Sequence, residues 1–179
     1  MDLAAAESNI TLAIDASTKS TGVAIYKNKE LIKYQCITSS SKDVLTRIKF
    51  MVDELEKIYN DYNITQVIIE DVLPDNLTED NNKWMKNRNT FKALMYLQAA
   101  ILLMLHHYKA DVELIGATSW RKRCGIKQGY VTRDILKARD IEFVKNKFNI
   151  SVNDDIADAI CIGWAKVNTQ PEPAAFNWE

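Results

Sequence analysis

The stretch Ile10–Tyr26 reads ITLAIDASTKSTGVAIY, and it indicates how the chain begins to fold. Its first part, Ile10–Asp15, is apolar and rich in β-branched residues, which is typical of a buried strand that ends in an acid. Ser17–Gly22 carries turn-forming residues, and Val23–Tyr26 returns to an apolar strand pattern. A third strand pattern follows at Leu31–Thr38, so we expect an antiparallel meander.

The rest of the chain alternates helix and strand patterns. Apolar residues at steps of three and four predict helices, and short apolar runs predict strands. The expected helices are Leu45–Tyr62, Phe91–Tyr108, Thr132–Phe148 and Asp154–Val167, and the expected strands are Val67–Ile69 and Val112–Ile115. Residues 74–89 are polar and irregular, and we expect a long loop there. The order of elements predicts an α/β fold with a mixed five-stranded sheet flanked by helices.

Composition places the chain among ordinary globular proteins. It has 179 residues, of which 47% are hydrophobic and 26% charged, and we expect one domain, 1–179, with loosely held tails at 1–8 and 168–179. The three cysteines form no CxxC pair, which indicates reduced thiols and no zinc site. There is no secretory signal pattern, and the longest apolar run, Ala99–Leu105, is too short for a membrane span. We expect a cytoplasmic protein.

Acidic side chains end two of the predicted strands and begin the last helix. Asp15 closes the first strand, Glu70 closes VIIE, and Asp155 and Asp158 lie three residues apart in DDIADAICIG. Spacing alone leaves open whether Asp154 or Asp155 shares the site with Asp158. Each acid singly has an ordinary explanation, as a turn former or as a partner of the helix dipole. Together they predict a divalent-metal site for phosphoryl transfer, because carboxylates are costly to bury without a cation and Mg²⁺ prefers oxygen ligands.

The net charge of -1 hides a strongly basic segment. Between Arg121 and Lys147 there are nine cations and three anions, which gives 9 − 3 = +6. A solvated helix face is one explanation, and a surface for a polyanion is the other. The candidate cations for binding such a polyanion are Arg121, Lys122, Arg123, Lys127 and Arg133. We expect the neighbouring Trp120 to be a packing residue rather than a base-stacking one.

Nucleotide-binding motifs are absent from the sequence. Neither GxGxxG nor GxxxxGK[ST] occurs, so we expect no nucleotide cofactor. The run Asp15–Thr18 has some likeness to the first motif of actin-like ATPases. Those proteins need a second, Gly-rich phosphate loop and about twice this length, so we set this reading aside.

The motifs as a set resemble those of a known family. The sequence IDASTKSTGVAIY, then VIIED, then DDIADAICIG is similar to the RuvC-type Holliday-junction resolvases, especially the compact versions of phages and related viruses. The resemblance extends over about Ile10–Val167. It implies an RNase H-like fold, a homodimer, two Mg²⁺ or Mn²⁺ ions per site, and nicking of paired strands in four-way DNA junctions.

The resemblance also implies roles for individual residues. Asp15 matches the first-strand acid, Glu70 the fourth-strand acid, and Asp155 and Asp158 the D-x-x-D motif; all four are candidate catalytic residues and metal ligands. The family comparison thereby selects Asp155 over Asp154. The apolar helix Phe91–Tyr108 matches the dimer helix of the family.

Two departures concern DNA recognition. The family often has D-P-G where this chain has Asp15-Ala16-Ser17, and the aromatic that follows the Glu in bacterial members is missing, with Trp84 only later. Bacterial members also carry two functional lysines, for which Arg121 or Lys122 and Lys127 or Arg133 are the candidates. The leading hypothesis is a metal-dependent endonuclease for four-way junctions and other branched DNA. The alternative is a branched-DNA-binding protein without catalysis.

Overall fold

The described part of the computed structural model comprises residues 9–72 and 81–169, with side chains described except at 81–87. These residues form five strands and five helices. The strands are β1 (Ile10–Asp15), β2 (Ser20–Lys27), β3 (Glu30–Thr38), β4 (Gln66–Glu70) and β5 (Asp111–Ile115). The helices are α1 (Val44–Asp61), α2 (Asn81–His107), α3 (Ala117–Arg123), α4 (Arg133–Phe148) and α5 (Asp154–Val167).

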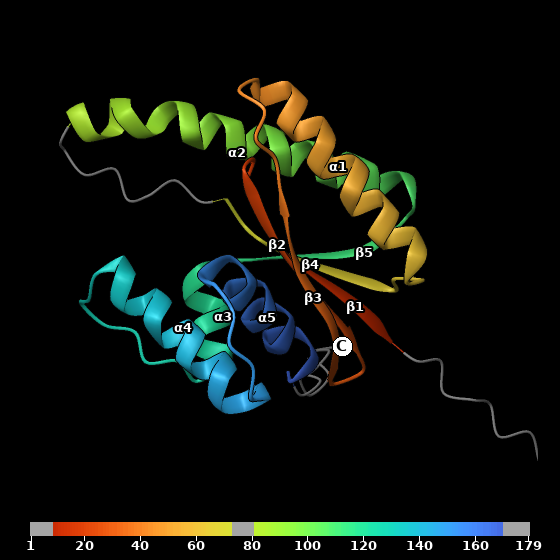
Figure 1. Ribbon diagram of the computed structural model, residues 1–179, viewed down its shortest axis with the longest axis vertical. Helices are drawn as coiled ribbons and strands as arrows, with labels where there is room; N and C mark the ends of the chain where they lie inside the picture. Colours follow the sequence, from red (N-terminus) through yellow and green to blue (C-terminus); the bar gives the residue numbers. More distant parts are fainter. Residues whose placement is uncertain (1–8, 73–80, 170–179) are drawn as a thin grey trace, which may run out of the picture.

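The strands form one mixed sheet in the order β3-β2-β1-β4-β5. The first three strands are antiparallel neighbours, as the opening meander predicts, and β1, β4 and β5 run parallel. Helices α1 and α2 lie on one side of this sheet, and α3, α4 and α5 lie on the other (Figure 1). The predicted α/β class with a mixed five-stranded sheet flanked by helices is confirmed.

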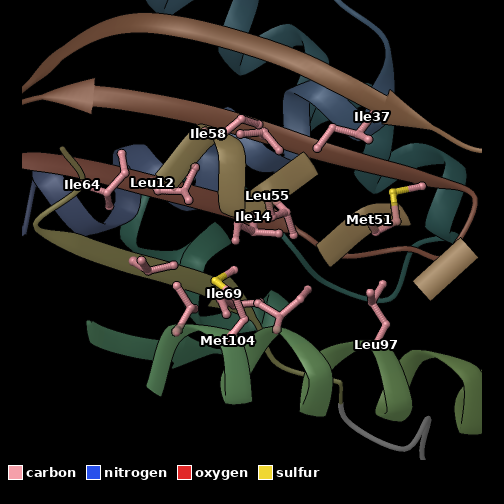
Figure 2. Close-up of a cluster of buried hydrophobic side chains, with 14 of the residues drawn as sticks. Leu12, Ile14, Ile37, Met51, Leu55, Ile58, Ile64, Ile69, Leu97 and Met104 are labelled. Atoms are coloured by element: carbon pink, nitrogen blue, oxygen red, sulfur yellow. The ribbon is translucent and has the colours of Figure 1, made fainter. Parts of the chain in front are cut away.

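The face of the sheet toward α1 and α2 is aliphatic. Alternate residues of the central strands, such as Leu12 and Ile14 of β1 and Ile69 of β4, are fully buried in this layer. They pack against Met51 and Leu55 of α1 and against α2 (Figure 2). Helix α1 begins where the sequence predicts, because the Asp43 carboxylate accepts a hydrogen bond of 2.7 Å from the Thr46 amide.

The opposite face of the sheet carries small residues, so helix α5 approaches it closely. A Cβ atom on Gly22 of β2 would lie 2.0 Å from the Asp155 carbonyl oxygen, and one on Gly163 would lie 2.4 Å from the Tyr26 ring. Asn153 caps α5 by accepting a 3.0 Å hydrogen bond from the Ile156 amide. These contacts hold the first turn of α5 over the end of β1.

Three sequence expectations differ from the structure. Helix α2 begins at Asn81, inside the stretch 74–89 that we expected to be a loop; residues 73–80 lie outside the described ranges. The first residues of α2 are polar, so the sequence shows no apolar periodicity there that would predict a helix. They extend the apolar helix that follows them in the sequence. Helix α3 was not predicted. The apolar spacing of 132–148 also predicts that Ile135 and Val144 face inward. Val144 is buried as predicted, but Ile135 is 44% exposed, and the fully buried Asp140 was not expected.

Two further expectations concern the tails of the chain and the lack of a membrane span. The tails 1–8 and 168–179 lie outside the described residues, except for Asn168 and Thr169. No helix in the described ranges has both the length and the apolar character needed to cross a bilayer.

The Gly22→Ala substitution tests the close approach of α5. We expect it to lower the free energy of unfolding by about 1–3 kcal/mol, because the new methyl group must displace the Asp155 carbonyl. Urea unfolding measures this. Gly125→Ala is the control, since it meets no atom within 4 Å and adds only the strain of a φ of +74°. A loss at Gly22 no greater than that at Gly125 would contradict the packing described.

Candidate active site

Two carboxylates lie side by side at the ends of neighbouring strands. Ile14 of β1 pairs with Ile69 of β4 in parallel register, so the next residues, Asp15 and Glu70, end adjacent strands. Because side chains alternate along a strand, both acids belong to the sheet face that packs on α5, like Ala13. The strand pattern of the sequence predicted that both acids end strands.

Helix α5 brings the other two carboxylates to the same place. Asp155 lies in its first turn, where its carbonyl packs on Gly22, the residue directly opposite Asp15 in the β1–β2 ladder. Its carboxylate accepts a hydrogen bond from the Ser20 hydroxyl. Asp158, one turn further on, is 7% exposed.

Asp154 has a different environment. Its carboxylate forms an ion pair with Lys137 of α4, and this contact lowers the pKa of Asp154. The charge of Asp155, in contrast, raises the pKa of Asp15. Of the two acids that spacing left open, Asp155 is therefore the neighbour of the strand-end acid.

Burial raises the pKa values of three of the acids, and neighbouring acids add to the shifts of Asp15 and Asp158. Burial, followed by the charges of Glu70 and Asp155, raises the pKa of Asp15 to about 7. Burial, followed by the charges of Asp15 and Asp140, raises the pKa of Asp158 to about 8. Burial also raises the pKa of Glu70, although a hydrogen bond from Trp120 opposes the shift. Without a cation, the cluster therefore favours protonation near neutral pH.

The chemistry of this cluster fits a divalent cation. All four side chains offer hard oxygen ligands, and the buried Oδ1 of Asp158 has no hydrogen-bond partner, which is unusual for a buried polar atom. The cluster is not a closed ligand shell, since no group of three His, Cys, Asp or Glu side chains in the described ranges has metal-binding geometry as placed. Asp155 and Glu70 instead turn oxygens to Ser20 and Trp120.

Glu70 contacts a buried layer formed by Trp120, Arg121 and Asp140. The Trp120 indole N–H donates a 2.9 Å hydrogen bond to Glu70 Oε2, and the ring is fully buried, as expected for a packing residue. The Arg121 guanidinium lies 4.1 Å from the centre of this ring and pairs with the fully buried Asp140, at 2.8 Å from Nη2 to Oδ2.

This layer changes the interpretation of Arg121. Sequence reasoning made it a DNA contact, but it is 8% exposed, and its Nε and Nη2 both donate hydrogen bonds to the Asp140 carboxylate. Its positive charge opposes the rise in the pKa of Asp158, so it stabilises the acid cluster from inside the protein.

The other candidate cations lie at the surface. Lys122, Lys127 and Arg133 are exposed, whereas the exposed Arg123 is paired with Glu113 at 2.7 Å. The charge of Arg133 opposes the rise in the pKa of Asp15 and of Glu70, so it acts on both acids.

Sequence reasoning missed Lys137 as a site residue. Its charge lowers the pKa of Asp15, and it binds Asp154. It follows Arg133 by four positions on α4, so helical spacing was the signal that could have identified it.

Comparison with solved structures identifies the fold. The structure of Thermus thermophilus RuvC with a Holliday junction substrate matches with a TM-score of 0.67 and 11% sequence identity, over 88% of this chain and 91% of that chain. The yeast mitochondrial Holliday junction resolvase Ydc2 matches with a TM-score of 0.57 and 11% identity, over 89% of this chain and 79% of that chain. The RuvC-like, RNase H-like fold implied by the sequence motifs is confirmed.

No protein-family model and no curated protein sequence matches the chain.

The raised pKa values predict how pH affects the metal-free protein. Asp15 and Asp158 keep their protons up to about pH 7 and 8 in the folded state, but lose them near pH 4 when unfolded. The folded state therefore binds more protons in this window, and the free energy of unfolding should fall as pH rises from 5 to 8. Thermal unfolding with EDTA measures this, and Mg²⁺ should restore stability at pH 8.

Asp15→Asn is the control for that experiment. It removes one titrating group, so the dependence on pH should become shallower. Stability that stays flat or rises between pH 6 and 8 in EDTA, without a response to Mg²⁺, would contradict the assignment.

The Trp120→Phe substitution tests the hydrogen bond to Glu70. It keeps an aromatic ring in the core but removes the N–H donor, and we expect about tenfold weaker Mn²⁺ binding by calorimetry. Trp164→Phe is the matched control, because this ring packs edge-on against Phe148 rather than on an acid. Equal Mn²⁺ affinity in both variants would show that the hydrogen bond does not orient Glu70.

Proposed function

We propose that this protein is a metal-dependent endonuclease that nicks four-way junctions and other branched DNA. The observation that carries the proposal is the gathering of Asp15, Glu70, Asp155 and Asp158 at one edge of the sheet, with a buried Asp158 oxygen that lacks a partner. The RuvC-like fold supports the same reading.

In this proposal the four carboxylates hold two Mg²⁺ or Mn²⁺ ions. Bound ions of this kind supply Lewis acidity and make water nucleophilic near neutral pH. Ser20 fixes one oxygen of Asp155, and Trp120 fixes one oxygen of Glu70, so each carboxylate keeps its other oxygen for a ligand role. Arg133 and Lys137, beside the acids, then bind the phosphate that is cleaved.

The DNA arms in this proposal lie along the exposed cations near α3 and α4. Lys122, Lys127 and Arg133 are open to solvent, and Arg123 joins them if it leaves Glu113. Such contacts fix the position of the backbone without reading sequence. Arg121 has no part in this surface.

We further propose that the protein forms a dimer through α2. Its inner side is buried at Leu97 and Ile101, while an outer stripe remains open at Met95 (41% exposed), Tyr96 (49%) and Leu103 (73%). These residues follow helical spacing, and an apolar stripe of this kind marks an interface. A symmetric pair would present two acid clusters to two strands of one junction.

A second candidate function has one observation in its favour. The acids lack a closed metal-binding geometry among the described residues, and a branched-DNA-binding protein without catalysis needs no such geometry. Cleavage of labelled four-way junctions, forks, flaps and duplex with Mg²⁺ or Mn²⁺ separates the two. We expect paired nicks near the branch point, and tight junction binding without nicks would favour the alternative.

Substitution of the acids tests their catalytic role. Asp15→Asn, Glu70→Gln and Asp158→Asn should each lower the rate of junction nicking at least about a hundredfold, because each removes a ligand oxygen charge from the site. Junction binding in EDTA should stay equal or become tighter, since negative charge beside phosphate is lost. Full nicking activity in any of the three would remove that residue from the mechanism.

The dimer proposal has its own test. Leu103→Asp should yield a monomer in light scattering, because it places a charge within the outer stripe of α2. Leu45→Asp, at a 69% exposed position on α1, is the matched control and should leave the mass unchanged. A wild-type protein that is monomeric at every concentration would contradict the dimer but not the nuclease.

A further inference from the structure

The turn between α3 and α4 carries the most open large hydrophobic side chain among the described residues. Tyr130 has a relative exposure of 112%, whereas the next most exposed, Leu103, has 73%. No hydrogen bond or ring contact involving Tyr130 occurs among the described residues. The Tyr130 ring therefore does not pack in the hydrophobic core.

The backbone that carries Tyr130 is nevertheless held firmly. Ile126 is buried in the core layer beneath α5. The Gln128 side-chain amide donates to the Thr118 carbonyl at 2.9 Å. The Arg139 guanidinium donates to the carbonyls of Lys127 and Gln128, at 2.7 and 3.2 Å. The turn is thus tied to α3 through its own Gln128 side chain and to α4 through Arg139.

The residues next to Tyr130 complete the turn. Gly129 has a φ of +111°, a conformation that favours glycine, and its carbonyl accepts a 2.9 Å hydrogen bond from the Val131 amide. A clamped backbone with a fully exposed ring is arranged to present that ring outward, because little ordering of the chain remains to oppose binding.

Tyr130 also lies between cations. Lys127 precedes it by three positions and Arg133 follows it by three, and both are exposed. Arg133 in turn lies within electrostatic range of Asp15 and Glu70. Tyr130 is therefore flanked in sequence by two exposed cations, and the charge of one of them acts on the acid cluster.

An exposed aromatic ring among cations matches the chemistry of unpaired nucleic acid. Cations follow the backbone, and flat rings stack on bases that have left a duplex. Bases within a continuous duplex already stack on one another, so a single ring gains little there.

We propose that Tyr130 stacks on an unpaired base at the branch point and so makes the protein prefer branched over duplex DNA. This inference rests on the proposed function, which it deepens by naming a residue that recognises the substrate.

The test compares Tyr130→Ala and Tyr130→Phe on a four-way junction and on duplex of equal length, by fluorescence anisotropy in EDTA. Tyr130→Ala should bind the junction about tenfold more weakly, because stacking on one base contributes that order of affinity. Its duplex affinity should match the wild type, and Tyr130→Phe should retain junction binding. A 2-aminopurine at the branch should be quenched by wild type and Phe, but not by Ala.

The dependence of DNA affinity on salt concentration distinguishes a stacking contact from a contact with phosphate. The slope of log affinity against log salt should be the same in Tyr130→Ala and wild type, since no phosphate contact is lost. Lys127→Ala should instead reduce the slope by about 0.9 on both DNAs. Tyr34→Ala, at a 38% exposed position on β3, is the matched control and should change nothing.

The possible results are distinct. Wild-type junction binding and quenching in Tyr130→Ala, with nicking intact, would overturn this inference and leave the proposed function standing. Equal weakening on junction and duplex would also overturn it, because the ring would then be a general contact. Failure of the wild type to bind any DNA would overturn both. Matching thermal unfolding midpoints confirm that the variant is folded.

Discussion

Negative charge is concentrated where β1 and β4 end, and the energetic cost of that charge explains much of the surrounding structure. The charge of Asp15 raises the pKa of Asp158, the charge of Asp155 raises the pKa of Asp15, and Glu70 adds to both shifts. Carboxylates this close are unfavourable in a half-buried position unless protons or cations neutralise them. The fold holds them together through packing elsewhere: α5 is fixed against β2 at Gly22 and Gly163, where any side chain would force it away.

Positive charge is arranged around the acids at two depths. Inside the protein, Arg121 pairs with Asp140 beside Trp120, which donates a hydrogen bond to Glu70. The charge of Arg121 opposes the rise in the pKa of Asp158, whereas the charge of Asp140 adds to it. At the surface, Arg133 and Lys137 of α4 act on Asp15 from the solvent side. The basic segment that stands out in the sequence thus serves two purposes, internal stabilisation for Arg121 and an open surface for its other members.

The sequence was sufficient for the parts of the fold that depend on local pattern. Alternating and apolar runs predicted that Asp15 and Glu70 end strands. The spacing of three residues between Asp155 and Asp158 predicted that both lie on one face of α5. It could not separate Arg121 from its exposed neighbours, because its partner Asp140 lies on another helix and the pairing depends on how α3 and α4 pack. The start of α2 at Asn81 was missed for a related reason, since a polar helix end has no periodic signal.

The most direct test of the account is a crystal structure of the protein with Mn²⁺, with anomalous data collected at the manganese edge. The account predicts two peaks between Asp15, Glu70, Asp155 and Asp158, with the unpaired Oδ1 of Asp158 among the ligands. Manganese bound only elsewhere, or no manganese peak at these four acids, would contradict it.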